Sequence, residues 1–198
     1  KFRVDLLESS MYKNNNFYKG IRTFNLTDPE ATNDREFLLR LNGGFDNQIT
    51  FSDLLINQNY LIFREKMLPL IFEKFQDIIV ISNWRSKLKF FHHKHIKISD
   101  NFISKYESEL KNVMDQLINI PQNSIVLSSA SSLTNIVGYK LFLCRKDITF
   151  LDIGTSINDL LSLPNKTRGY HELLDIYRFN SLPLKFFKLF FNDLFIRW

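Results

Sequence analysis

Short apolar runs alternate with longer segments of helical spacing in the middle of the chain. The runs are rich in β-branched residues and have the length of strands, and they cover residues 77–82, 95–98, 124–127 and 148–153. Between them, residues 101–118 and 133–145 carry apolar side chains at the spacing of one helix face. Runs that are apolar throughout are typical of strands covered on both faces of a parallel sheet. The pattern therefore predicts an α/β fold with a mainly parallel sheet flanked by helices.

The pattern also divides the chain into three parts. Residues 1–33 are largely polar and are treated as an N-terminal extension. The α/β domain is expected to span residues 34–177, and residues 51–75 within it predict one helix, with Pro69 as its kink. Residues 178–198 predict a C-terminal amphipathic aromatic helix.

The aromatic end of the chain has two open interpretations. Leu184 to Trp198 reads LKFFKLFFNDLFIRW, in which Lys185, Lys188 and Arg197 interrupt a dense aromatic run. Such a segment suits a membrane interface, although it is too short and too charged to span a bilayer. Docking onto the rest of the domain, or onto an adjacent domain of a longer chain, explains it equally well.

Composition narrows the partners further. A chain of 198 residues with 44% hydrophobic residues can bury the core of one large domain. The net charge of +5 suits a phosphate-bearing ligand or an anionic membrane surface. Nucleic acid is not an expected partner, because the basic residues are dispersed and no RNA-binding aromatic signature is present. Cys144 can form no intrachain disulfide and is expected in the core, which favours a reducing, cytoplasmic location.

Polar loops after the predicted strands mark the candidate site. Ligands of such sheets bind beyond the carboxyl ends of the strands, where this chain has Ser82-Asn83, Ser128 to Ser132 and Gly154 to Asp159. The serine turn precedes a predicted helix, so it either binds phosphate or simply caps that helix. Neither GxGxxG nor GxxxxGK[ST] occurs, which argues against dinucleotide-fold dehydrogenases and P-loop ATPases.

Four residues near this region carry the candidate chemistry, each with a structural alternative. Asp152 follows the apolar part of its strand and could bind a hydroxyl group, hold a metal or accept a proton, or else pair with Arg168 or cap a neighbouring turn. Asp159 could act in the same way or favour the first turn of a helix. Arg168 could contact a diphosphate or remain a surface cation. His171 suits acid–base work or a structural hydrogen bond.

One family resembles this segment. DIGTSIND at residues 152–159 and TRGY at residues 167–170 resemble the GT-D-fold glycosyltransferases and GT-D-like domains, in which Asp-x-Gly-Ser-x-x-Asp precedes Thr-Arg-x-Tyr. The similarity covers residues 36–170 and is specific in its last part. It implies a Rossmann-like domain that transfers a sugar from a nucleotide-sugar donor to a glycan or protein acceptor, with a divalent cation, manganese or magnesium.

The motifs and the residue chemistry together define the candidate site. The candidate catalytic residues are Asp152, Asp159 and His171. The candidate donor-binding residues are Arg40, Asn42, Gly43, Gly44, Ser129, Ser131, Ser132, Gly154, Thr155, Ser156, Arg168 and Tyr170.

An early motif of the family is only partly matched. The family typically carries Arg-x-Gly-Asp-Gly-Glu, whereas residues 40–45 read RLNGGF, with Asp46 one position later. We therefore assign no metal ligand there. His92-His93-Lys94-His95 looks like a metal cluster but lacks a Cys or acidic partner at ligand spacing, and an exposed basic loop explains it as well. Two hypotheses follow: a glycosyltransferase, or a noncatalytic binding or scaffolding module of a larger glycan-building protein.

Overall fold

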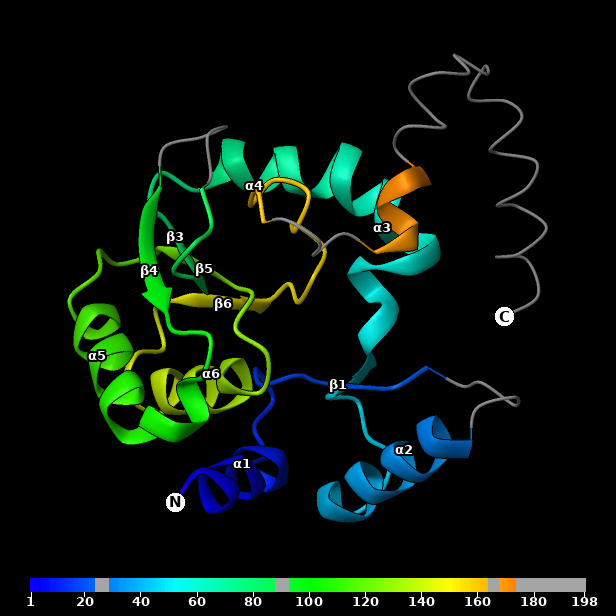
Figure 1. Cartoon of the computed structure of the whole chain (residues 1–198). Coiled ribbons are helices and arrows are strands. Elements are labelled where there is room, and N and C mark those ends of the chain that lie inside the picture. Colours follow the sequence, from blue (N-terminus) through cyan, green and yellow to red (C-terminus); the bar gives the residue numbers. More distant parts are fainter. Residues whose placement is uncertain (24–28, 88–92, 164–167, 174–198) are drawn as a thin grey trace.

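A parallel four-stranded sheet forms the centre of the protein (Figure 1). The computed structural model describes residues 1–23, 29–87, 93–163 and 168–173. The strand order is β4-β3-β5-β6, with bounds β3 Ile78–Asn83, β4 Lys94–Ile98, β5 Ile125–Ser128 and β6 Thr149–Asp152. Helices flank this sheet, which confirms the predicted α/β class with a parallel sheet.

Helices and turns account for most of the remaining described residues. The helices are α1 Phe2–Met11, α2 Pro29–Asn42, α3 Tyr60–Ile62, α4 Leu68–Lys74, α5 Tyr106–Ile118 and α6 Leu133–Cys144. The 3₁₀ turns are η1 Ser52–Leu55, η2 Asn57–Asn59, η4 Phe102–Lys105 and η5 Gly169–His171, and η3 Phe63–Met67 is a π-helical turn. A second, two-stranded parallel sheet pairs β1 Lys19–Ile21 with β2 Ile49–Phe51.

The large sheet is buried on both faces. Because successive side chains of a strand point to opposite faces, Ile79 and Ile81 pack on one side with α5 and α6. Ile78 and Val80 pack on the other side with η3, α4 and residues 153–161. Both strand faces are therefore apolar, which explains why the sequence shows continuous apolar runs rather than alternation.

Helix α1 packs against α5 and α6, the helices that cover one face of the large sheet. Asp5 of α1 is fully buried, and its carboxylate accepts a hydrogen bond from Tyr106 Oη and lies 3.6 Å from Lys140 Nζ of α6. β1 precedes residue 33 and pairs with β2, which follows it. The boundary predicted between residues 33 and 34 falls inside α2.

One local prediction holds in part and two are wrong. Residues 60–74 form a continuous helical run, made of α3, the π-helical turn η3 and α4. Residues 51–59 form a strand end and two 3₁₀ turns instead, and Asn57 there has a left-handed backbone with φ of 53°. The helix expected after Gly154 is replaced by successive turns with hydrogen bonds three residues apart, and Ser162 again has φ of 53°. Cys144 is exposed at the end of α6 rather than in the core.

The predicted C-terminal helix, residues 178–198, lies outside the described residues. Among the helices of the described part of the chain, none combines the length and the apolar character needed to cross a bilayer.

Candidate functional site

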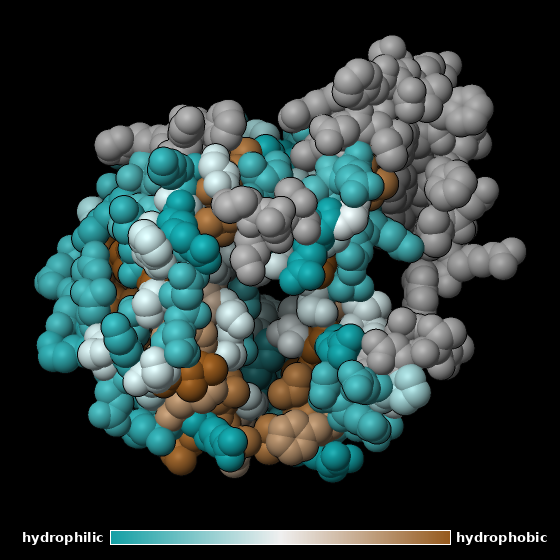
Figure 2. All heavy atoms as spheres, in the orientation of Figure 1, coloured by the Kyte–Doolittle hydropathy of each residue, from teal (hydrophilic) through white to brown (hydrophobic). Residues whose placement is uncertain are grey.

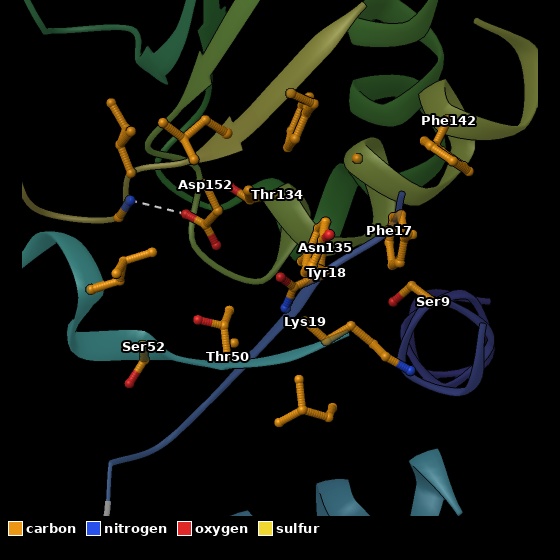
Figure 3. A pocket seen from close by; sticks show the side chains of 18 of the residues that line it. Ser9, Phe17, Tyr18, Lys19, Thr50, Ser52, Thr134, Asn135, Phe142 and Asp152 are labelled. Carbon is orange, nitrogen blue, oxygen red and sulfur yellow. Dashed lines mark hydrogen bonds between the residues drawn. The ribbon is translucent and has the colours of Figure 1, made fainter. Parts of the chain in front are cut away.

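A cavity of about 1150 Å³ separates the sheet half of the protein from the small β1–β2 sheet. Figure 2 shows it as a hollow in the middle of one face, and Figure 3 looks into it. One wall consists of residues 148–155, which include the edge strand β6, and of α6. The opposite wall consists of the end of α1, β1, β2 and η1. The cavity thus reaches the carboxyl end of β6, where parallel sheets commonly bind ligands.

The predicted site residues divide into two groups with respect to this cavity. Those that line it are Asn42, Asp152, Gly154 and Thr155. Those that do not are Arg40, Gly43, Gly44, Ser129, Ser131, Ser132, Ser156, Asp159, Arg168, Tyr170 and His171.

Asp152 is the last residue of β6 and faces the cavity (Figure 3). Its Oδ1 accepts a hydrogen bond from the backbone N–H of Gly154 at 2.9 Å, which fixes the carboxylate and leaves Oδ2 toward the space. The side chain of Asp152 is exposed to solvent, although protein atoms of the cavity wall crowd around it. This partial loss of hydration raises the pKa of Asp152, and the Gly154 hydrogen bond opposes the rise. The carboxylate can therefore accept a hydrogen bond or a proton from a ligand hydroxyl.

The serine turn before α6 is closed by internal hydrogen bonds. The buried Thr134 hydroxyl lies 2.8 Å from Ser128 Oγ and accepts a hydrogen bond from the Ala130 N–H at 3.1 Å. Ser131 is exposed and has a left-handed backbone with φ of 53°. It is Thr134 and Asn135, not the serines, that line the cavity.

Tyr170 and His171 hold Thr155 in the cavity wall. The hydroxyl groups of Thr155 and Tyr170 are hydrogen-bonded. His171 Nε2 donates to the Thr155 carbonyl oxygen at 3.1 Å, while Nδ1 accepts from the Arg168 N–H at 2.6 Å. Both ring nitrogens of this buried histidine are therefore occupied, and the predicted acid–base residue serves here as a structural clamp. The Arg168 side chain is exposed and outside the cavity lining.

Asp159 pairs with a residue of the π-helical turn η3. Its Oδ2 lies 3.2 Å from Arg64 Nη2 and 3.3 Å from Arg64 Nε, and both side chains are mostly buried. The pair connects η3 with the turns that follow Gly154, beside the buried ring of Tyr60. Asp159 is thus placed to stabilise this connection rather than to contact a ligand in the cavity. Ser156 is buried as well, and its hydroxyl donates to the Ile153 carbonyl oxygen at 2.6 Å.

The RLNGGF segment ends helix α2. Gly43 and Gly44 have φ of 75° and 107°, and their N–H groups bond to the carbonyl oxygens of Arg40 and Leu39. These left-handed glycines are a common way to close a helix. The Arg40 side chain is 70% exposed and lies 4.0 Å from Glu36.

Asn42 and Lys19 join three elements beside the cavity. The buried amide of Asn42 donates to the Gly44 carbonyl oxygen at 2.7 Å and to Asp46 Oδ2 at 2.9 Å, and its Oδ1 accepts from Lys19 Nζ. Lys19 Nζ also donates to the carbonyl oxygens of Ser10 and Tyr12 at the end of α1. This group connects α1, α2 and β1, and burial lowers the pKa of Lys19 despite the opposing charge of Asp46.

The residues around Asp152 do not fit a divalent cation. Hard cations take several oxygen ligands, commonly more than one carboxylate. Among the described lining residues Asp152 is the sole carboxylate, and one of its oxygens already binds Gly154. No cluster of three His, Cys, Asp or Glu side chains in the described ranges could hold a metal ion. His95 instead contacts Ser82 Oγ at 2.8 Å, and His92 lies outside the described residues.

Several lining residues escaped the sequence prediction. Lys19, Thr50 and Asn135 line the cavity but belong to no motif. Thr50 and Lys19 lie in three-residue strands whose pairing depends on tertiary contact, so local sequence carries little signal for them. Asn135 lies in the first turn of α6, three residues after Ser132, and its place after a strand was the one signal that could have indicated it.

Comparisons of the chain with protein-family models, with curated proteins and with solved structures find no match.

Proposed function

We propose that this protein binds a sugar-containing ligand of the nucleotide-sugar class in the central cavity and acts as a GT-D-like, Rossmann-like glycosyltransferase. The observation that carries the proposal is the position of Asp152. It ends a parallel strand, its carboxylate is fixed by Gly154, and it faces a cavity of about 1150 Å³. Typical ligand pockets measure about 300–1,000 Å³, so the cavity has room for more than one sugar ring.

The proposed chemistry uses Asp152 as the proton acceptor. The acceptor hydroxyl donates a hydrogen bond to Asp152 Oδ2 and attacks the anomeric carbon of the donor sugar. A new carbon–oxygen bond forms, the bond to the diphosphate breaks, and the hydroxyl proton passes to Asp152. The raised pKa of Asp152 brings the carboxylate closer to the basicity that proton transfer requires. Thr155, held by Tyr170 and His171, keeps the turn beside Asp152 in place.

A noncatalytic binding module is the second candidate, and a specific observation favours it. Asp159 is paired with Arg64, and both nitrogens of His171 are hydrogen-bonded. Two of the three candidate catalytic residues are therefore committed to structural contacts. These two residues support the turns beside the cavity instead of facing a ligand, which suits a binding domain without transfer activity.

Two measurements on the full chain test these candidates. Thermal unfolding is followed with a panel of uridine, guanosine, adenosine and thymidine diphosphate sugars, since a ligand that binds the native state raises the melting temperature. Release of nucleoside diphosphate is then measured with and without oligosaccharide acceptors. Binding with release supports the transferase, and binding without release supports the module. If no nucleotide sugar raises the melting temperature and none is consumed, both are rejected.

Matched variants assign the result to the site. Asp152→Ala is expected to abolish diphosphate release, whereas Asp115→Asn, at an exposed position on α5, leaves it unchanged. Arg168→Ala tests the motif-based role of that guanidinium. Normal turnover in a folded Asp152→Ala variant would place the chemistry elsewhere.

A further inference from the structure

The charged residues that line the cavity are few, and most of them are engaged by the protein itself. Among the described lining residues they are Lys19, Arg145, Lys146 and Asp152. A diphosphate is normally held by several cations or N–H donors that are free to point at it. Whether the N–H donors of these cations are free or already bonded to the protein therefore decides which part of a sugar-containing ligand the cavity suits.

Lys19 and Arg145 have no donor left for a ligand. The three hydrogens of an ammonium group match the three acceptors around Lys19 Nζ, which are the carbonyl oxygens of Ser10 and Tyr12 and Asn42 Oδ1. The guanidinium of Arg145 makes two hydrogen bonds to Asp147 and three to the carbonyl oxygens of Ile118 and Ile120. These five contacts equal the five N–H donors of an arginine.

Lys146 remains as a single exposed cation. Its Nζ lies 3.5 Å from the ring centroid of Phe142, in a cation–π contact. One lysine over an aromatic ring supplies a point charge at the end of the cavity away from Asp152, because it precedes β6 whereas Asp152 ends it. This is a weak basis for holding a diphosphate.

Some neutral polar side chains of the lining have no hydrogen-bond partner among the described residues. In the part of the chain that the structure describes, the side chains of Asn135, Thr50 and Ser52 make no hydrogen bond. Figure 3 shows Asp152, Asn135 and Thr50 entering the same space from β6, α6 and β2. An amide, a hydroxyl and a carboxylate together offer both donors and acceptors, which is what a ring with several hydroxyl groups requires.

Aromatic side chains complete the lining. Tyr18, Phe142 and Phe150 all border the cavity, and Tyr18 is 62% exposed. Flat apolar faces beside a few fixed polar groups are the usual composition of a site for a small organic ligand. The faces of sugar rings that carry C–H groups pack on such aromatic surfaces, while their hydroxyl groups reach the polar residues.

We infer that the cavity holds an uncharged saccharide, with Asp152, Asn135 and Thr50 bonding its hydroxyl groups, and that it does not hold the diphosphate of a donor. The inference rests on the proposed function and makes it more specific. The saccharide is either a free acceptor or the sugar ring of the donor, and in both cases the groups that recognise it are the same. The diphosphate of a bound donor then lies outside this lining.

Saturation-transfer difference NMR on the full chain tests the inference, because it detects weak binding without labelling. The probes are neutral mono- and oligosaccharides, uridine diphosphate, inorganic phosphate and a uridine diphosphate sugar. We expect ring-proton signals from neutral saccharides, with an affinity that changes less than about twofold between about 50 and about 500 mM sodium chloride, since screening acts on charged ligands. Free saccharide signals identify an acceptor, whereas sugar signals from the nucleotide sugar alone identify the donor ring.

Matched variants complete the test. Asp152→Asn is expected to weaken saccharide binding about tenfold, because a hydrogen bond to a charged group is lost. Asn135→Ala, independently, is expected to weaken it about threefold to about tenfold, because a hydrogen bond to a neutral amide is lost. Lys146→Ala and Asp115→Asn leave saccharide binding unchanged. If uridine diphosphate or phosphate binds in a salt-sensitive manner that Lys146→Ala abolishes, while neutral sugars give no signal, the inference is overturned and the proposed function survives. If no probe binds, both are overturned.

Discussion

Asp152 has no cationic partner among the described residues, although its side chain faces the cavity. The loss of hydration in the cavity raises its pKa, and within the described chain its side chain bonds only to the Gly154 N–H. A carboxylate kept mainly for stability is usually paired, as Asp159 is with Arg64. An unpaired carboxylate that faces a cavity is the arrangement expected of a group reserved for a ligand.

The first prediction is that Asp152→Asn stabilises the protein while it weakens ligand binding. Because the folded pKa is raised, the folded state holds the proton more tightly, so ionisation above the unfolded pKa costs stability. Asparagine removes this cost and keeps an acceptor for the Gly154 N–H. At pH 7 the free energy of unfolding should rise by less than about 1 kcal/mol, since solvent screens the group. Urea denaturation measures the change.

The pH dependence separates this effect from a general change in packing. The advantage of Asp152→Asn should disappear below about pH 4, where the wild-type carboxyl is protonated in both states. Asp115→Asn, in an exposed ion pair with Lys111, is the control and should change stability little. A variant at Asp152 that is less stable than wild type at pH 7 would show that the residue is structural.

Asp5 provides the opposite case and the second prediction. Burial alone would raise the pKa of Asp5, but hydrogen bonds from Tyr106 and Lys1 and the charge of Lys140 outweigh it and lower the pKa. A lowered folded pKa contributes stability above the unfolded value of about 3.9 that is lost as the pH falls through the folded pKa. Asp5→Asn should therefore cost about 1–3 kcal/mol at pH 7.

Urea denaturation at several pH values checks this second prediction. The difference between wild type and Asp5→Asn should be constant above about pH 5 and shrink below about pH 4. Tyr106→Phe, which removes the hydroxyl donor and keeps the ring, should show a smaller loss with the same trend. A difference that is independent of pH would mean that the charge of Asp5 does not matter.

At the scale of elements, burial on both faces made the sheet predictable. β3 and β5 lie within one residue of the predicted 77–82 and 124–127, because strands covered on both sides need continuous apolar residues. Residues 51–75 have helical spacing as well, and residues 60–74 do form a continuous helical run with a π-helical turn in its middle. Residues 51–59 do not, because Phe51 belongs to β2, which pairs with the distant β1, and two 3₁₀ turns follow it.

The candidate site was predictable only where it belongs to a strand end. Asp152, Gly154 and Thr155 follow a buried strand, and they line the cavity. The positions of the motif residues Arg168 and Tyr170 could not be predicted from sequence. They depend on how η5 packs against the turn at Thr155, which is a tertiary contact. The opposite wall could not be predicted from sequence either, because β1 and β2 are far apart in the chain and pair only in the folded protein.

Helix α6 contacts β6 through a glycine, which gives the third prediction. A Cβ atom at Gly138 would lie 2.9 Å from Cε1 of the Phe150 ring, closer than packed atoms approach. Gly138→Val should therefore lower the free energy of unfolding by about 1–3 kcal/mol through overpacking. Leu143→Val, at a half-exposed position of the same helix, is the control for β-branched helix propensity and should cost about 0.5 kcal/mol.

A double-mutant cycle identifies the contact responsible. Phe150→Ala removes the ring that the new side chain would meet, so the double variant should lose less stability than the two single variants together. Chemical denaturation of all four proteins gives the coupling. Strictly additive losses would show that Gly138 is needed for the helix itself and not for its approach to β6.

At the scale of the whole molecule, the cavity lies between two parts of the chain. Its walls come from β6 and α6 on one side and from the end of α1, β1 and β2 on the other. The polar groups that we assign to a saccharide are likewise divided, with Asp152 and Asn135 on one wall and Thr50 on the other. A ligand that bonds both walls must stabilise their association, since binding to the native state alone shifts the folding equilibrium.

The fourth prediction follows from this division. On addition of a neutral oligosaccharide, amide hydrogen exchange should slow in residues 17–21 and 49–52 as well as in residues 149–155, although these segments are far apart in sequence. At saturation near 100 times the dissociation constant the added protection corresponds to about 2.7 kcal/mol. In Asp152→Asn, which binds about tenfold more weakly, the same sugar concentration should give only about 1.4 kcal/mol of added protection in all three segments. Protection confined to residues 149–155 would mean that the ligand contacts the β6 wall alone and that β1 and β2 take no part in binding.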